Sequence, residues 1–109
     1  MRVAIVGSRN LTIEDLSLHL PENTTEIVSG GAKGIDTCAE IYSKEHGIPL
    51  TLFLPEYDKY GRSAPIIRNK KIVDYSDITI AFWDGKSRGT QFVIQECKRK
   101  NKPLKLIII

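Results

Sequence analysis

The sequence predicts an α/β protein with a small Rossmann-like, three-layer fold, in which a five-stranded parallel sheet lies between two layers of helices. Three observations predict this class. Five short apolar runs are distributed along the 109 residues, segments with a helical period separate them, and glycine, proline or acidic turn residues follow most of the runs. Strands that alternate with helices need crossover connections, which are right-handed and place helices on both faces of a parallel sheet.

The expected strands are short and mostly apolar, as strands buried on both faces are. They cover residues 3–6, 27–28, 50–54, 78–82 and 104–109. Gly7 ends the first strand and Pro55 ends the third. We expect the strand order 3-2-1-4-5, in which the first and fourth strands are neighbours and the connections reverse direction between them. A crevice then opens beyond the carboxyl ends of these two strands, where ligands of such sheets bind.

The first two helices follow the first two strands. A helix over about residues 12–20 is expected to be capped by Thr12 and ended by Pro21. The second helix, over about residues 33–46, has apolar residues at the i, i+3, i+4 and i+7 positions of one stripe, and Gly47 is its expected C-terminal stop.

The third and fourth helices follow the third and fourth strands. In the third, over residues 63–75, Ser63 is the expected cap, and Pro65 is tolerated because it lies in the first turn. The fourth repeats the apolar spacing of the second over residues 90–97.

Length and composition describe a single globular domain over residues 1–109. Hydrophobic residues make up 41% of the chain, within the range of folded domains once its 8 glycines are added. No apolar run approaches the roughly 18 residues of a membrane span, and the first run is too short for a signal peptide. We therefore expect a cytoplasmic protein without membrane contact, in which Cys38 and Cys97 are free thiols.

The charge is distributed unevenly. Residues 1–58 carry 4 basic and 9 acidic side chains, a net charge of −5, whereas residues 59–109 carry 12 basic and 4 acidic, a net charge of +8. Such asymmetry favours partners that carry phosphate. For the basic cluster at residues 98–102 we favour a structural interpretation, because cations near the C-terminus of a helix complement its dipole.

The loop after the first strand reads Gly7-Ser8-Arg9. A glycine lets the backbone approach a ligand, a hydroxyl can donate a hydrogen bond, and a guanidinium can bind phosphate through two bonds. A turn that uses glycine and serine only for its conformation is the alternative.

The loop after the second strand, residues 29–36, holds three glycines and leads into a helix. Backbone N–H groups at a helix start, together with the positive end of the dipole, form a cradle for an anion. The spacing is neither that of a Walker loop nor that of a dinucleotide fingerprint, and tight packing of strand against helix is the alternative role for the glycines. The candidate binding residues here are Ser29, Gly30, Gly31, Ala32, Gly34 and Asp36.

The loop after the fourth strand enters a helix through a second glycine-bearing turn, where Ser87 or Thr90 can cap. Its free N–H groups form a second seat for an anion. Asp84 either accepts from a ribose hydroxyl or, more commonly for a turn aspartate, from the backbone of its own turn. The candidate binding residues are Trp83, Gly85, Ser87, Gly89 and Thr90.

Arg68 and Asn69 lie about one turn into the third helix, close enough to the carboxyl edge of the sheet to reach a bound phosphate. Tyr57, Tyr60 and Trp83 lie in loops at the same edge, and one of them is a candidate for stacking on a base, with core packing as the alternative.

We expect neither a metal nor a cofactor. His19 and His46 are isolated, and no Cys, His and Asp spacing resembles a zinc site. The Gly-x-Ser-x-Gly elbow of acyl hydrolases is also missing.

Four motifs resemble, in order along the chain, those of the YspA-like branch of the SLOG superfamily. That superfamily includes the LOG cytokinin-activating enzymes and the DprA recombination mediators. The resemblance spans nearly the whole chain, and it implies a Rossmann-like domain, often dimeric, that binds nucleotides or nucleotide-derived ligands. The motifs are Gly7-Ser8-Arg9, residues 29–36, Tyr60-Gly61 together with Arg68-Asn69, and residues 83–90.

The enzymatic branch of this superfamily hydrolyses the N-glycosidic bond of nucleoside monophosphates. Its signature pairs Arg-Lys on the third helix with Pro-Gly-Gly-x-Gly-Thr-x-x-Glu after the fourth strand. Arg68 matches the arginine, but Asn69 replaces the lysine, Val93 occupies the position of the glutamate, and the first acid on that helix is Glu96. A carboxylate is needed there because the reaction passes through an oxocarbenium-like state.

Three functions follow from the resemblance, and we favour the first. The domain binds a nucleotide or nucleotide-derived ligand. Alternatively it is an N-glycosidase, with Arg68 orienting the phosphate and Asp84 or Asp36 supplying the carboxylate. The third is DprA-like binding of single-stranded DNA by the positive second half, ranked last because the chain lacks interleaved basic and aromatic residues.

Overall fold

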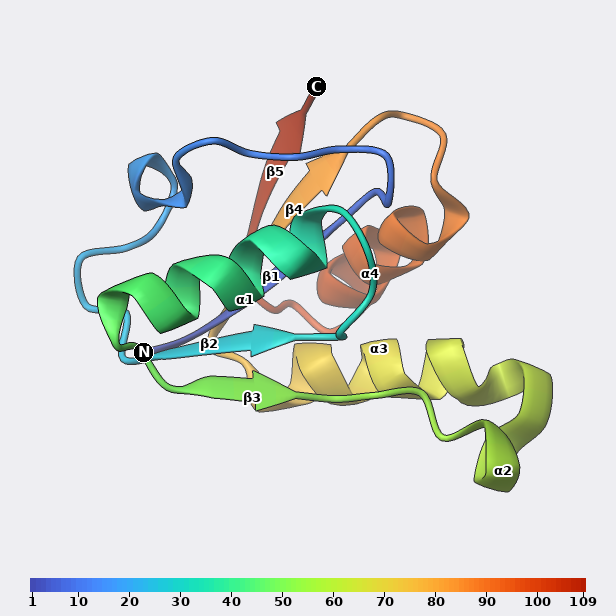
Figure 1. Ribbon diagram of the computed structural model, residues 1–109. Coiled ribbons are helices and arrows are strands. Elements are labelled where there is room, and N and C mark those ends of the chain that lie inside the picture. Colours follow the sequence, from blue (N-terminus) through green and yellow to red (C-terminus); the bar gives the residue numbers. More distant parts are fainter.

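The computed structural model describes all 109 residues. Its five strands form one sheet in the order β3-β2-β1-β4-β5, and every pairing is parallel, which confirms the predicted fold (Figure 1). In the register of the central pair Gly7 lies opposite Phe82, so β1 and β4 end together at one edge. The strands are β1 (Arg2–Gly7), β2 (Glu26–Ser29), β3 (Leu50–Leu52), β4 (Ile78–Trp83) and β5 (Leu104–Ile108).

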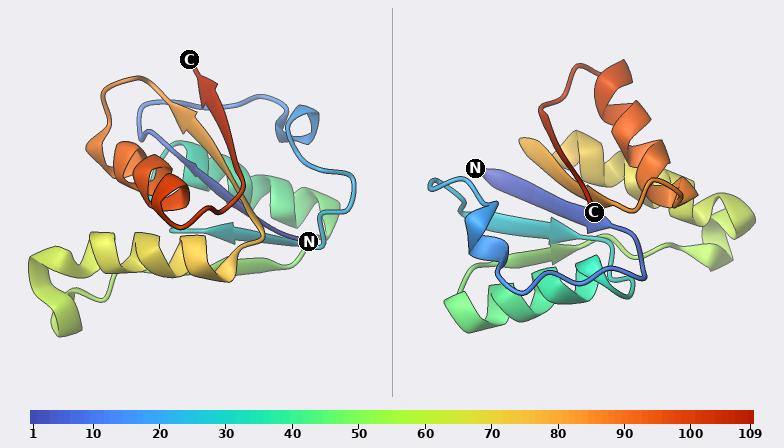
Figure 2. Two further views of the ribbon diagram at one scale, coloured as in Figure 1. Left: turned by 180° about the vertical axis from the view of Figure 1, so that it is seen from behind. Right: turned by 90° about the horizontal axis from the view of Figure 1, so that it is seen from above.

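The helices lie on both faces of this sheet (Figure 2). One face is covered by α1 and a short 3-10 helix, η1, and the other by α3 and α4 (Figures 1 and 2). A four-residue helix, α2, and a 3-10 turn, η2, precede α3 at the end that projects from the body of the molecule. The bounds are η1 (Leu16–Leu18), α1 (Ile35–His46), α2 (Tyr57–Tyr60), η2 (Gly61–Ser63), α3 (Ala64–Tyr75) and α4 (Arg88–Arg99).

The central strands are buried on both faces, which explains their continuous apolar runs. In β1, Val3 and Ile5 pack in the cluster under α1, whereas Ala4 and Val6 pack in the cluster under α3 and α4. Phe82 of β4 is also fully buried. Each large side chain buried in this way stabilises the fold by about 1.5–3 kcal/mol.

The prediction of a helix over residues 12–20 with Thr12 as its cap is wrong. The chain makes only the single turn η1, and its cap is Asp15, whose carboxylate accepts from the backbone N–H of Ser17 at 3.0 Å. Short polar side chains that bond the nearby backbone compete with helix formation. Leu16 is the one fully buried residue of this turn, and Ile13 and Leu20 pack against the same core cluster, so these apolar side chains reach the sheet without a longer helix.

The limits of α1, α3 and α4 agree with the sequence to within one or two residues, but α2 forms where Tyr57 and Tyr60 were expected in a loop, and one cap differs. The side chain of Ser63 makes no capping hydrogen bond at α3, and a proline in the first turn begins that helix. Gly47 ends α1 in the left-handed conformation, as predicted. No helix is both long enough and apolar enough to span a bilayer.

The basic cluster at the end of α4 is held by the fold itself. Arg99 and Lys100 pair with the buried Glu96, and Lys100 also pairs with Asp74 of α3. Lys102 donates to the carbonyl of Asp74 at 3.2 Å. These contacts support the structural interpretation of the cluster.

Candidate functional site

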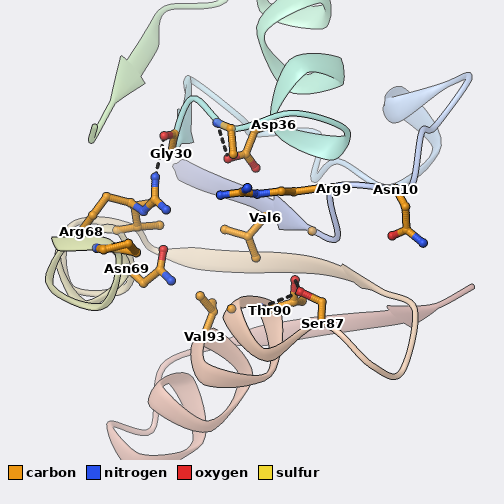
Figure 3. A pocket seen from close by; sticks show the side chains of 15 residues that line it. Val6, Arg9, Asn10, Gly30, Asp36, Arg68, Asn69, Ser87, Thr90 and Val93 are labelled. Carbon is orange, nitrogen blue, oxygen red and sulfur yellow. Dashed lines mark hydrogen bonds between the residues drawn. The ribbon is translucent and has the colours of Figure 1, made fainter. Parts of the chain in front are cut away.

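A pocket of about 480 Å³ opens at the carboxyl ends of β1, β2 and β4, where the reversal of connections predicts a crevice. Side chains from both helical layers converge on it (Figure 3). Ten of the predicted site residues line it, namely Gly7, Arg9, Gly30, Ala32, Asp36, Arg68, Asn69, Ser87, Gly89 and Thr90.

Arg68 reaches from α3 across the pocket to the loop after β2. Its Nη1 donates to the carbonyl oxygen of Gly30 at 2.7 Å. Burial lowers the pKa of the Arg68 guanidinium, and the carboxylate of Asp36 opposes this effect. The group stays charged, because the ordinary pKa of arginine lies far above neutrality. Its Nε atom is buried without a hydrogen-bond partner, an arrangement that costs about 1–3 kcal/mol.

Asp36 is the one carboxylate that lines the pocket. It lies in the first turn of α1, only 6% exposed, and its Oδ2 accepts from the backbone N–H of Ala32 at 3.1 Å. Burial raises the pKa of Asp36, while the Ala32 N–H and the Arg68 guanidinium act to lower it. The carboxylate therefore shapes the loop and faces Arg68 at the same time.

The loops after β1 and β2 pack closely against each other, and this contact positions Arg9. Gly34 has φ +75°, and a Cβ there would lie 2.4 Å from the backbone oxygen of Arg9. A Cβ on Gly7 would lie equally close to the side chain of Ile35. Only glycine fits both positions. The exposed side chain of Arg9 extends from this junction into the pocket, toward Asp36 and Arg68 (Figure 3).

The start of α4 forms the opposite wall. Of the two caps that the sequence allowed, Ser87 is the one that forms, since its Oγ accepts from the backbone N–H of Thr90 at 3.4 Å. Gly89 is exposed, and a Cβ at this position would meet no other group within 4 Å. The first-turn N–H groups and the positive end of the helix dipole therefore favour an anion at this wall.

Asp84 lies outside the pocket and serves its own turn. Its Oδ1 accepts from the backbone N–H groups of Lys86 and Ser87, both at 2.8 Å. These bonds lower the pKa of Asp84, so its carboxylate stays ionised. The structure thus supports the local role that the sequence also allowed, and Asp36 is the carboxylate that the pocket holds.

Other predicted residues support the loops from behind rather than line the pocket. The Oγ of Ser8 accepts from the N–H of Asp84 at 3.2 Å, and the Oγ of Ser29 accepts from the N–H of Gly31 at 3.4 Å. The indole of Trp83 donates to the carbonyl of Ser87 at 3.0 Å. The remaining three, Gly31, Gly34 and Gly85, all have positive φ and set the paths of the loops.

Sequence reasoning missed five lining residues. Four of them, Val6, Pro65, Ile72 and Val93, are apolar or belong to the core, and no polar pattern distinguishes them. Asn10 directly follows Arg9, and its place in the same loop is the signal that could have found it.

α4 has no carboxylate at the position where the signature of the N-glycosidase branch has its glutamate. Val93 lines the pocket at its position, and Glu96 lies one turn further along, where it pairs with Arg99 and Lys100. The pocket therefore presents two guanidinium groups, one buried carboxylate and a helix start. This arrangement suits recognition of an anion.

A family model for DNA recombination-mediator protein A matches residues 1–60, more than half of the chain. The matched part contains the loops after β1 and β2 and therefore Arg9, Gly30 and Asp36. The match supports the resemblance to the SLOG superfamily. No curated protein and no solved structure gave a significant match.

Proposed function

The chain belongs to the DNA recombination-mediator protein A family, and from the geometry of its pocket we propose that it binds a nucleotide or nucleotide-derived ligand through the phosphate. We further propose that it belongs to the YspA-like branch of the SLOG superfamily, and the motifs beyond residue 60, above all Arg68-Asn69 and residues 83–90, support this assignment.

One observation carries this proposal. Arg9 from the loop after β1, Arg68 from α3 and the first turn of α4 all meet in a single pocket. A guanidinium binds phosphate through two parallel N–H bonds, and a helix start adds backbone donors and a favourable dipole. Three separate elements thus favour an anion in this pocket, and only the carboxylate of Asp36 opposes it.

The size and lining of the pocket fit the rest of such a ligand. Its volume of about 480 Å³ lies within the usual range for small-molecule sites. Val6, Ile72 and Val93 supply an apolar wall against which a sugar ring can pack, and Asp36 and Asn69 supply acceptors for its hydroxyl groups.

Calorimetric titration with adenosine 5′-monophosphate tests the proposal. We expect the Arg68→Ala variant to bind roughly 10- to 100-fold more weakly, because a hydrogen bond to a charged group contributes about 1.5–3 kcal/mol. Arg62→Ala is the matched control, since it removes the same charge from an exposed position that does not line the pocket. Equal affinity in both variants contradicts the proposal, provided that circular dichroism shows both to be folded.

Single-stranded DNA is the second candidate ligand, and the family match favours it. The loops that border the pocket also carry the exposed side chains of Arg9, Lys33, Lys86 and Arg88, which could follow a phosphate backbone. Binding of this kind weakens steeply with salt, because each neutralised phosphate releases counterions. We expect the logarithm of the affinity for a short single strand to fall linearly with the logarithm of the salt concentration. An affinity that is independent of salt removes this candidate.

A further inference from the structure

A second, smaller hollow adjoins the pocket on the other side of Arg68. It has a volume of about 120 Å³, a quarter of that of the main pocket, and it lies between the chain that follows β3 and the first half of α3. Arg68 lines both hollows and is the single residue that they share. The two hollows therefore meet at this residue.

The lining of this hollow differs from that of the main pocket. Six of its nine lining residues are hydrophobic, among them Phe53, Leu54 and Ile67. Tyr60, at the end of α2, is another of the six, and its aromatic ring is partly exposed. The hollow is thus suited to a flat, apolar ring system, whereas the main pocket is suited to an anion.

Two charged side chains lie at the rim of the smaller hollow. Lys71 and Glu56 pair with Nζ and Oε1 3.4 Å apart, and both remain about half exposed. The ammonium group of Lys71 lies 5.6 Å from the centre of the Tyr60 ring. A planar ligand that rests on Tyr60 therefore meets one donor and one acceptor at its edge, which is the pairing that the edge of a nucleobase offers in return.

We infer that this smaller hollow holds the nucleobase of the ligand whose phosphate lies in the main pocket, with Tyr60 as the stacking platform. The inference rests on the proposed function. The ligand is a base joined to a phosphate through a sugar. A free mononucleotide and one nucleotide of a single strand both have this structure.

Of the three aromatic residues that the sequence places at this edge, the structure singles out Tyr60. Tyr57 and Trp83 line neither hollow, and Trp83 is tied to the backbone of Ser87. The ring of Tyr60 faces a hollow that adjoins the proposed phosphate site, so one ligand can contact both. Every base has a π-face, and stacking on an aromatic ring does not depend on the identity of the base.

The position of Arg68 also fits a ligand that spans both hollows. Its guanidinium is planar, and such a plane packs well against a heterocycle while its N–H groups bind phosphate. Within the protein this guanidinium makes one hydrogen bond, from Nη1 to the carbonyl of Gly30. A base can therefore pack on the plane of this group while a phosphate binds its remaining N–H groups.

The test compares two ligands that differ only in the base. We expect wild-type protein to bind adenosine 5′-monophosphate more tightly than ribose 5-phosphate, and Tyr60→Ala to remove most of that preference. The expected loss for the nucleotide is about tenfold, within the range for stacking of a base on an aromatic side chain. Affinity for ribose 5-phosphate should be the same in both proteins, and Tyr60→Phe should restore most of the lost preference because it keeps the ring.

A second readout needs no variant. The ring protons of Tyr60 in the wild-type NMR spectrum should move upfield on addition of the nucleotide and stay in place on addition of ribose 5-phosphate. A short oligodeoxyadenylate and an abasic strand of equal length repeat the comparison, and the pair that shows the base effect identifies the source.

Two failures are distinguishable. If ribose 5-phosphate binds and depends on Arg68, but a base adds nothing or Tyr60→Ala weakens both ligands equally, the base site is refuted and the phosphate site stands. If ribose 5-phosphate and every other probe bind the wild type and Arg68→Ala with equal affinity, the proposed function itself fails and the base site with it.

Discussion

Gly34 provides a sharp test of how the loops build the site, because a single methyl group there meets the backbone rather than a flexible side chain. The residue has φ +75° and ψ −119°, a region that only glycine occupies easily, and a Cβ would lie 2.4 Å from the backbone oxygen of Arg9. Backbone strain of this kind costs about 1–3 kcal/mol, and forced overpacking costs a similar amount. We expect Gly34→Ala to lower the free energy of unfolding by about 3 kcal/mol or more.

Gly47→Ala is the matched control, because that glycine also has a positive φ, +63°, but nothing lies within 4 Å of its Cβ direction. Strain alone should cost about 1–2 kcal/mol there. Gly47 lies in the left-handed helical region with ψ 29°, so the difference of about 2 kcal/mol between the variants combines the contact with Arg9 and the greater backbone strain at Gly34. For a domain of this size it corresponds to a gap of roughly 10 °C between their melting temperatures.

Urea denaturation measures both free energies, and titration with adenosine 5′-monophosphate on the folded variants measures the consequence for the site. The loop that carries Arg9 must move in Gly34→Ala, so binding should weaken there, whereas Gly47→Ala should bind like the wild type. Equal destabilisation and equal affinity in the two variants would refute the reasoning that the close approach of the two loops positions Arg9.

Three further predictions concern the site. Arg9→Ala should weaken binding of adenosine 5′-monophosphate about tenfold in calorimetric titration, because an exposed guanidinium contributes at the lower end of the range for charged hydrogen bonds. Burial raises the folded-state pKa of Asp36 above its ordinary value of 3.8, so the folded state binds more protons than the unfolded state. The free energy of unfolding, relative to that of Asp36→Asn, should therefore fall as the pH rises above 3.8. Urea denaturation over a series of pH values measures it, and a rise with pH contradicts the prediction. Prolonged incubation with nucleoside monophosphates should release no free base, because the pocket wall on α4 lacks a carboxylate; steady release that Arg68→Ala abolishes would favour the glycosidase instead.

The sheet could be predicted from the sequence because its determinants are local and repeated. Apolar runs such as residues 3–6 and 78–82 are buried on both faces, and the handedness of crossovers then restricts the strand order. The helix expected over residues 12–20 failed for the opposite reason. Ile13, Leu16 and Leu20 have the spacing of a helix and all pack against the core, but the hydrogen bond from the Ser17 N–H to Asp15 forms a single turn there instead.

The site could be predicted as a set of loops, but not as a set of contacts. Glycine-rich turns at the carboxyl ends of strands indicate which segments meet. Which side chains turn inward depends on packing between distant elements. Arg68 reaches Gly30 across 38 positions of sequence, and Trp83 turns away from the pocket to bond Ser87. The sequence offers both Asp84 and Asp36 as the carboxylate of the site, and the fold places only Asp36 in the pocket.

The central claim is that the carboxyl edge of the sheet holds one phosphate between Arg9, Arg68 and the start of α4. Titration of ¹⁵N-labelled protein with adenosine 5′-monophosphate, followed by the amide signals, tests it most directly. The account predicts that the largest shifts fall in residues 7–10, 30–36 and 87–90 and saturate together. Shifts that gather instead around β5 and the C-terminal end of α4, at the opposite end of that helix, contradict it.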